Sequence, residues 1–90
     1  MTTVETTYYA GAADRLGTVT EVYEGVDTAE GLLERIVDRH GEDVRPTLAA
    51  CAFLTAAGRV EGEDQLRLGG DADEVGGALK VDVLPPFAGG

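Results

Sequence analysis

Residues 26–41, VDTAEGLLERIVDRHG, predict one amphipathic helix that needs a second layer to cover it. The residues of its apolar stripe recur at the i, i+3, i+4 and i+7 spacing: Ala29, Leu32, Leu33, Ile36, Val37 and His40. Asp27 or Thr28 is the expected N-cap, and Gly41 is expected to end the helix as a left-handed cap. Because the helix has a single apolar face, it is expected to pack on a sheet.

Strand-forming residues lie on both sides of this helix. Before it, residues 2–9 and 18–23 are rich in Thr, Val and Tyr. Residues 10–17 between them predict a loop or a short helical turn, which makes the two strands an antiparallel pair with a wide connection. After the helix, residues 51–55 and 79–84 predict further strands.

The segments between these elements carry weaker signals. Residues 42–50 are ambiguous, because Pro46 disfavours a helix through the residue before it but permits a short one just after. Residues 59–61 are expected to pair back on the preceding strand, and residues 65–68 predict another short strand. Residues 69–77 hold four glycines and three acids, which predicts a flexible surface loop.

The order of these elements predicts an α+β fold in which one main helix covers a mixed sheet. For a chain of 90 residues this order favours the β-grasp, or ubiquitin-like, arrangement, in which the first and last strands pair in parallel at the sheet centre. We expect one domain over residues 1–84 and an extended tail over residues 85–90.

Composition narrows the classes of partner. Seventeen acids against seven bases give a net charge of −10, which disfavours nucleic acid and anionic membranes and favours a partner with a basic face. No apolar run approaches the roughly 20 residues of a membrane helix, no signal peptide is evident, and the single cysteine excludes an intramolecular disulfide. We expect a cytoplasmic protein.

Few side chains suggest chemistry of their own. Cys51 lies in an apolar segment and is expected to be a small buried hydrophobe, while His40 is expected to cap carbonyls or to pack. Asp71, Asp73 and Glu74 lack the spacing of a calcium loop, so we expect no metal site. No phosphate-binding loop is present, so no cofactor is expected on this chain.

The strongest functional signal is the terminal segment, whose residues are Pro85, Pro86, Phe87, Ala88, Gly89 and Gly90. Two prolines favour an extended polyproline course, and Phe87 is a candidate anchor for a partner pocket. The two glycines lack side chains, so they can enter a narrow channel. The segment suggests the presentation of a C-terminal carboxylate.

The stretch from Val83 to Gly90, VLPPFAGG, resembles the C-terminus of the MoaD/ThiS family of sulfur carriers, and most of all the small subunits of molybdopterin synthase of actinobacterial type. Weaker similarity covers residues 8–17 and 28–33. The resemblance implies that an ATP-dependent enzyme adenylates Gly90 and that a thiocarboxylate then forms there. It further implies a heterotetramer with the synthase large subunit, in which sulfur passes to precursor Z (cyclic pyranopterin monophosphate).

Other interpretations of the tail remain open. The same carrier chemistry serves thiamine and cysteine biosynthesis, and a ubiquitin-like modifier would instead form isopeptide bonds through Gly90. A passive β-grasp interaction module is an alternative of another class. On any of the carrier interpretations the chain is not catalytic alone, and ATP is bound by the activating partner.

Overall fold

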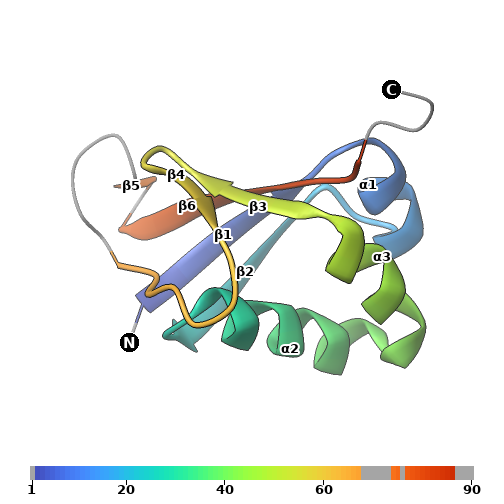
Figure 1. The fold of residues 1–90 in the computed structure, drawn as a ribbon, viewed down its shortest axis with the longest axis horizontal. Helices are drawn as coiled ribbons and strands as arrows, with labels where there is room; N and C mark the ends of the chain where they lie inside the picture. Colours follow the sequence, from blue (N-terminus) through green and yellow to red (C-terminus); the bar gives the residue numbers. More distant parts are fainter. Residues whose placement is uncertain (1, 68–73, 76, 87–90) are drawn as a thin grey trace.

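The computed structural model describes residues 2–67, 74–75 and 77–86 (Figure 1). In chain order the elements are β1 (Thr2–Tyr8), α1 (Ala10–Leu16), β2 (Thr20–Val26), α2 (Ala29–His40), η1 (Glu42–Val44), α3 (Arg45–Ala50), β3 (Ala52–Thr55), β4 (Gly58–Val60), β5 (Glu74–Val75) and β6 (Ala78–Leu84).

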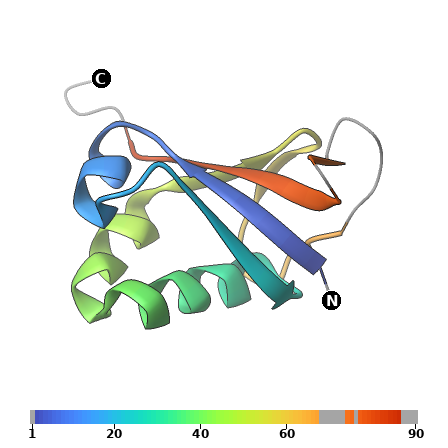
Figure 2. The same cartoon turned by 180° about the vertical axis from the view of Figure 1, so that it is seen from behind.

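The strands form one mixed sheet with the order β2-β1-β6-β3-β4, and β5 pairs with β6 outside this path. Strands β1 and β6 pair in parallel at the centre, and the other pairs are antiparallel. Helices α2 and α3 lie against one face of the sheet, which both views show (Figures 1 and 2). The predicted α+β arrangement with one main helix over a mixed sheet is therefore confirmed.

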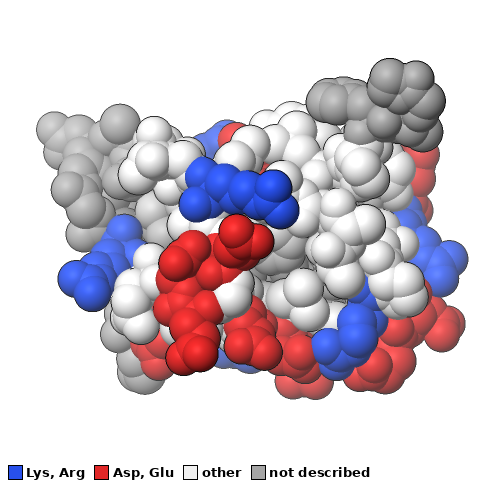
Figure 3. All heavy atoms as spheres, in the orientation of Figure 1, with Lys and Arg blue, Asp and Glu red and all other residues white. Residues whose placement is uncertain are grey.

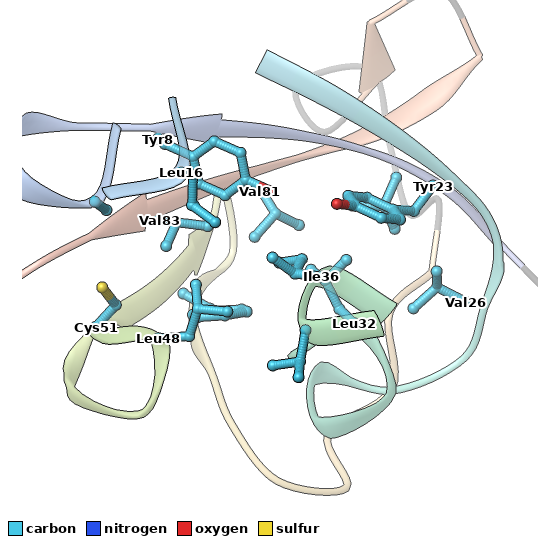
Figure 4. Packing of buried hydrophobic residues seen from close by; sticks show 14 of the residues in the cluster. Tyr8, Leu16, Tyr23, Val26, Leu32, Ile36, Leu48, Cys51, Val81 and Val83 are labelled. Atoms are coloured by element: carbon cyan, nitrogen blue, oxygen red, sulfur yellow. The ribbon is translucent and has the colours of Figure 1, made fainter. Parts of the chain in front are cut away.

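Strand alternation and the helix stripe together build the core (Figure 4). The side chains that face α2 from the two central strands are fully buried: Val4, Thr6 and Tyr8 of β1, and Leu79, Val81 and Val83 of β6. Leu32, Ile36 and Val37 of α2 meet them at 0–1% exposure. Each such apolar side chain contributes about 1.5–3 kcal/mol before conformational entropy is counted.

Helix α2 begins at a side-chain cap and ends at a glycine with a positive φ. Thr28 is the N-cap, and its hydroxyl accepts a hydrogen bond from the Gly31 amide at 3.0 Å. The predicted left-handed cap at Gly41 is wrong in its geometry, because this residue has φ 104° and ψ 163°. The positive φ still favours glycine there, and it turns the chain directly into η1.

Two of the weaker predictions are wrong. Residues 65–67 form no strand; Gln65 makes an isolated bridge to Thr28, and Leu66 is buried. The expected loop 69–77 contains β5 at Glu74–Val75, which folds back on β6, and its other residues except 77 lie outside the described part. At Gln65 a long-range contact decides the conformation, whereas β5 forms a local hairpin with the start of β6.

A largely buried carboxylate lies at the edge of the core, beside the end of α2. The side chain of Glu21 is 8% exposed and accepts hydrogen bonds from Tyr8 at 2.8 Å, from Tyr23 at 2.7 Å and from His40 Nε2 at 2.8 Å. The prediction for His40 was that it caps carbonyls or packs; the structure shows its ring bound to the Glu21 carboxylate. The cluster ties β1, β2 and α2 together at one point.

These contacts shift the titration of the groups involved. Burial raises the pKa of Glu21, but hydrogen bonds from Tyr23, His40 and Tyr8 outweigh it, so the pKa lies below the ordinary 4.5. Burial, followed by the hydrogen bond to Glu21, raises the pKa of Tyr23 to about 12. Glu21 is therefore ionised in the folded protein, and the tyrosines remain donors.

Replacing Glu21 with Gln should lower the free energy of unfolding by about 1–3 kcal/mol at pH 7, because buried donors lose their charged acceptor. Since folding depresses the pKa of Glu21, its contribution is present above pH 4.5 and is lost as the pH falls through the folded value. Urea unfolding of E21Q and wild type from about pH 7 to pH 3 should thus show a gap that narrows on acidification. E24Q, at an exposed site on the same strand, is the control, and a gap independent of pH would contradict this account.

Candidate functional site: the end of strand β6

Strand β6 is held on both sides up to its last residue. It pairs in parallel with β1 through Val83 and in antiparallel with β3 through Leu84. Pro85 follows at once, and proline has no amide hydrogen with which to continue a ladder. Pro85 is half-buried and Pro86 is exposed, so the chain leaves the sheet here with its φ angles fixed.

A shallow groove of about 340 Å³ runs beside this exit. Its lining comes from β3, β4, the end of α3 and the exit itself: Ala50, Ala52, Leu54, Arg59, Leu84, Pro85 and Pro86. The register explains the groove, because Ala52 lies opposite Leu84 and Leu54 lies opposite Arg59 on the face away from α2. The groove forms because the side chains of Ala50 and Ala52 are too small to fill the space beside Leu54 and Leu84.

The same outer face carries polar contacts and exposed apolar side chains. The Tyr9 hydroxyl donates to Asp82 Oδ1 at 3.2 Å, and Lys80 Nζ lies 4.0 Å from the same oxygen. Val22 of β2, opposite Glu5, is 50% exposed on this face. The outer sheet face is thus a mixed surface next to the chain exit, suitable for contact with a partner.

The structure describes only part of the predicted site. It brings Pro85 and Pro86 to the groove, while Phe87, Ala88, Gly89 and Gly90 lie outside the described residues. Sequence reasoning missed Leu54 and Arg59 as neighbours of the exit. The sequence offered no local signal for them, since a single leucine on the outward face of a strand is common at protein surfaces.

Cys51 has no reactive environment. It is 7% exposed, its Sγ donates to the Thr47 carbonyl at 3.1 Å, and burial raises the pKa of its thiol. The prediction of a buried, hydrophobe-like cysteine is confirmed. Within residues 2–67, 74–75 and 77–86 no group of three His, Cys, Asp or Glu side chains is placed to hold a metal ion.

The topology of this chain defines a β-grasp, ubiquitin-like fold, with the first and last strands parallel at the sheet centre. The crystal structure of SAMP1 from Haloferax volcanii is similar, with a TM-score of 0.67 and 17% identity over 98% of this chain and 99% of that one. No family model matches the sequence, and no curated protein matches it either.

None of the helices within the described residues is long and apolar enough to cross a membrane.

The two faces of β3 should respond differently to truncation. Phe53 points into the core at 5% exposure, so F53A should cost about 3–5 kcal/mol of unfolding free energy. Leu54, its neighbour, lies half-buried in the outer groove, so L54A should cost about 1 kcal/mol. Urea unfolding of both variants measures the difference, and equal costs would show that Leu54 belongs to the core.

Proposed function

We propose that this chain is a sulfur carrier, and specifically the sulfur-donating small subunit of a molybdopterin synthase. The observation that carries the proposal is that the central strand of a β-grasp sheet, β6, leads directly into residues 85–90. The resemblance of VLPPFAGG to the sulfur-carrier terminus supports the choice of pathway. In this proposal Gly90 is the C-terminal residue of the working protein.

The chemistry takes place on the Gly90 carboxylate. A carboxylate oxygen attacks the α-phosphate of ATP, which gives an acyl-adenylate and releases pyrophosphate. A sulfur donor then displaces AMP at the carbonyl carbon and leaves a thiocarboxylate. The large subunit of the synthase binds precursor Z, and the thiocarboxylate donates its sulfur toward the dithiolene of molybdopterin.

The tail residues suit insertion into a partner. Gly89 and Gly90 allow the carbonyl carbon to be approached closely, and Ala88 adds little bulk. Phe87 is proposed to anchor in a pocket of the partner. The prolines restrict the free tail, which lowers the entropy lost on insertion, and the groove beside them gives the partner a surface to contact.

The partners follow from this assignment. An ATP-dependent activating enzyme supplies adenylation and sulfur, so ATP is bound by that enzyme and this chain alone is not catalytic. Two copies of the carrier and two large subunits form the proposed heterotetramer, in the cytoplasm. The net charge of −10 favours partners with basic docking faces.

Deleting Gly90 should abolish sulfur loading without altering the fold, because the electrophilic carbon must sit at the end of the double glycine. Full-length protein incubated with the activating enzyme, ATP and a sulfur source should gain the mass of one oxygen-to-sulfur exchange. Intact mass spectrometry checks this, and the Gly90 deletion should show no gain. A variant with one residue added after Gly90 should also fail.

G11A is a matched control, since a side chain at Gly11 meets no atom within 4 Å and should leave loading intact. Loading of the deletion variant would refute the assignment of Gly90. Adducts on lysines of other proteins would indicate a modifier, and no change in mass would indicate a passive module. Release of molybdopterin with the large subunit present distinguishes this pathway from thiamine and cysteine biosynthesis.

Replacing Pro85 and Pro86 with Gly should weaken insertion of the tail while the chemistry stays intact. Each proline restricts the free chain by about 0.4–1 kcal/mol, so the double variant should raise the KM for the carrier roughly 4–30-fold with kcat unchanged. Steady-state adenylation at varied carrier concentration measures this. A fall in kcat at constant KM would assign the prolines to the chemical step.

A further inference from the structure

A second hollow lies on the helix side of the sheet, between α2, α3 and the β3–β4 pair. Its volume is about 350 Å³, and its apolar lining includes Leu33, Leu48, Phe53 and Val60. Leu48 and Phe53 are buried core residues, whereas Leu33 and Val60 remain partly exposed. The size lies at the lower end of the range for small binding sites, about 300–1,000 Å³, and has room for one large side chain and its flanks.

The rim of this hollow is mainly acidic. Glu30 and Glu61 line it, and Glu63 and Asp64 follow Glu61 on an exposed turn. Figure 3 shows a group of acidic side chains gathered over the segment after β4 and the start of α2. The turn is fixed, because Asp64 accepts a hydrogen bond from the Glu61 amide at 2.9 Å.

Within the described residues little positive charge offsets these carboxylates. Arg59 is the one cation in the described lining, with its side chain 60% exposed and its guanidinium 3.9 Å from Glu61. No ion pair among the described residues involves Glu30 or Glu63. An exposed pair at that distance is worth less than about 1 kcal/mol, so Glu61 stays available to another cation.

The negative charge of the chain favours a basic partner over a second copy of this chain in the hollow. A second copy of this chain carries the same −10, and two such surfaces repel each other. A peptide segment with an apolar side chain between lysines or arginines complements both parts of the site. The apolar side chain packs on the apolar lining, and the cations pair with the carboxylates at the edge of the hollow.

We propose that this hollow docks a basic amphipathic segment of a partner protein, with a large apolar residue in the floor and cations on Glu30 and Glu61. The site adjoins the groove at the chain exit, since Arg59 lines both hollows, but it uses the opposite face of the sheet. A partner seated there leaves the chain exit open. The proposal does not depend on the chemistry at Gly90.

The probe is a blocked hexapeptide, KKFLKK, titrated into full-length protein and followed by amide chemical shifts. The shifts of Leu33, Phe53 and Val60 should change saturably, with little change at Thr7 and Val22 on the outer face. The peptide KKSSKK should bind at least about tenfold more weakly, because burial of the phenylalanine is lost. The double variant E30K/E61K should weaken KKFLKK binding about tenfold.

The double variant D14K/E24K has the same net charge at exposed sites that do not line the hollow, and it should bind within about twofold of wild type. If KKFLKK and KKSSKK bound equally well, the proposal would be overturned in favour of general charge attraction. An equal loss of KKFLKK affinity in E30K/E61K and D14K/E24K would have the same meaning. Absence of binding, or shifts centred on the outer face, would also overturn it. Shifts that depend on protein concentration without peptide would make a second copy the occupant.

Discussion

The parallel pairing of β1 with β6 is the constraint on which the rest of the structure depends. It joins residues about 75 positions apart in sequence, from Val4 with Leu79 to Tyr8 with Val83. Parallel neighbours need a long connection, and α2 lies within that connection and covers the buried face of both strands. The pairing also fixes where β6 ends, so the point at which Pro85 leaves the sheet follows from the register at the centre of the core.

Glu21 adds a polar contact to this apolar framework. A buried carboxylate is costly unless its hydrogen bonds are satisfied, and here two tyrosines and a histidine from three different elements satisfy it. Apolar packing alone would tolerate small shifts of α2 along the sheet. The geometry at Glu21 restricts this freedom, which fixes the helix that lines one of the two hollows.

Periodicity was sufficient to predict α2 and the two central strands, and the order of the elements predicted the parallel pairing of those strands. It did not predict that Glu21 is buried, because a glutamate in a strand rich in threonine and valine suggests an exposed position. Only the register, with Thr6 opposite Glu21, places that side chain inside. The site was predicted as a linear tail, whereas Leu54 and Arg59 reach the exit through pairing of β3 with β6 and β4, which no local pattern encodes.

The strand pair β3–β4 at the edge of the sheet lines two hollows, one on each face of the sheet. Leu54 and Arg59 face outward next to the chain exit, while Phe53 and Val60, each one residue away, face α2 and the acidic rim. The strand period of two therefore gives one short strand pair two chemically different surfaces. The proposed carrier function, which requires contact with an activating enzyme and an acceptor in turn, fits this arrangement, because a contact on the helix side leaves the residues around Pro85 accessible.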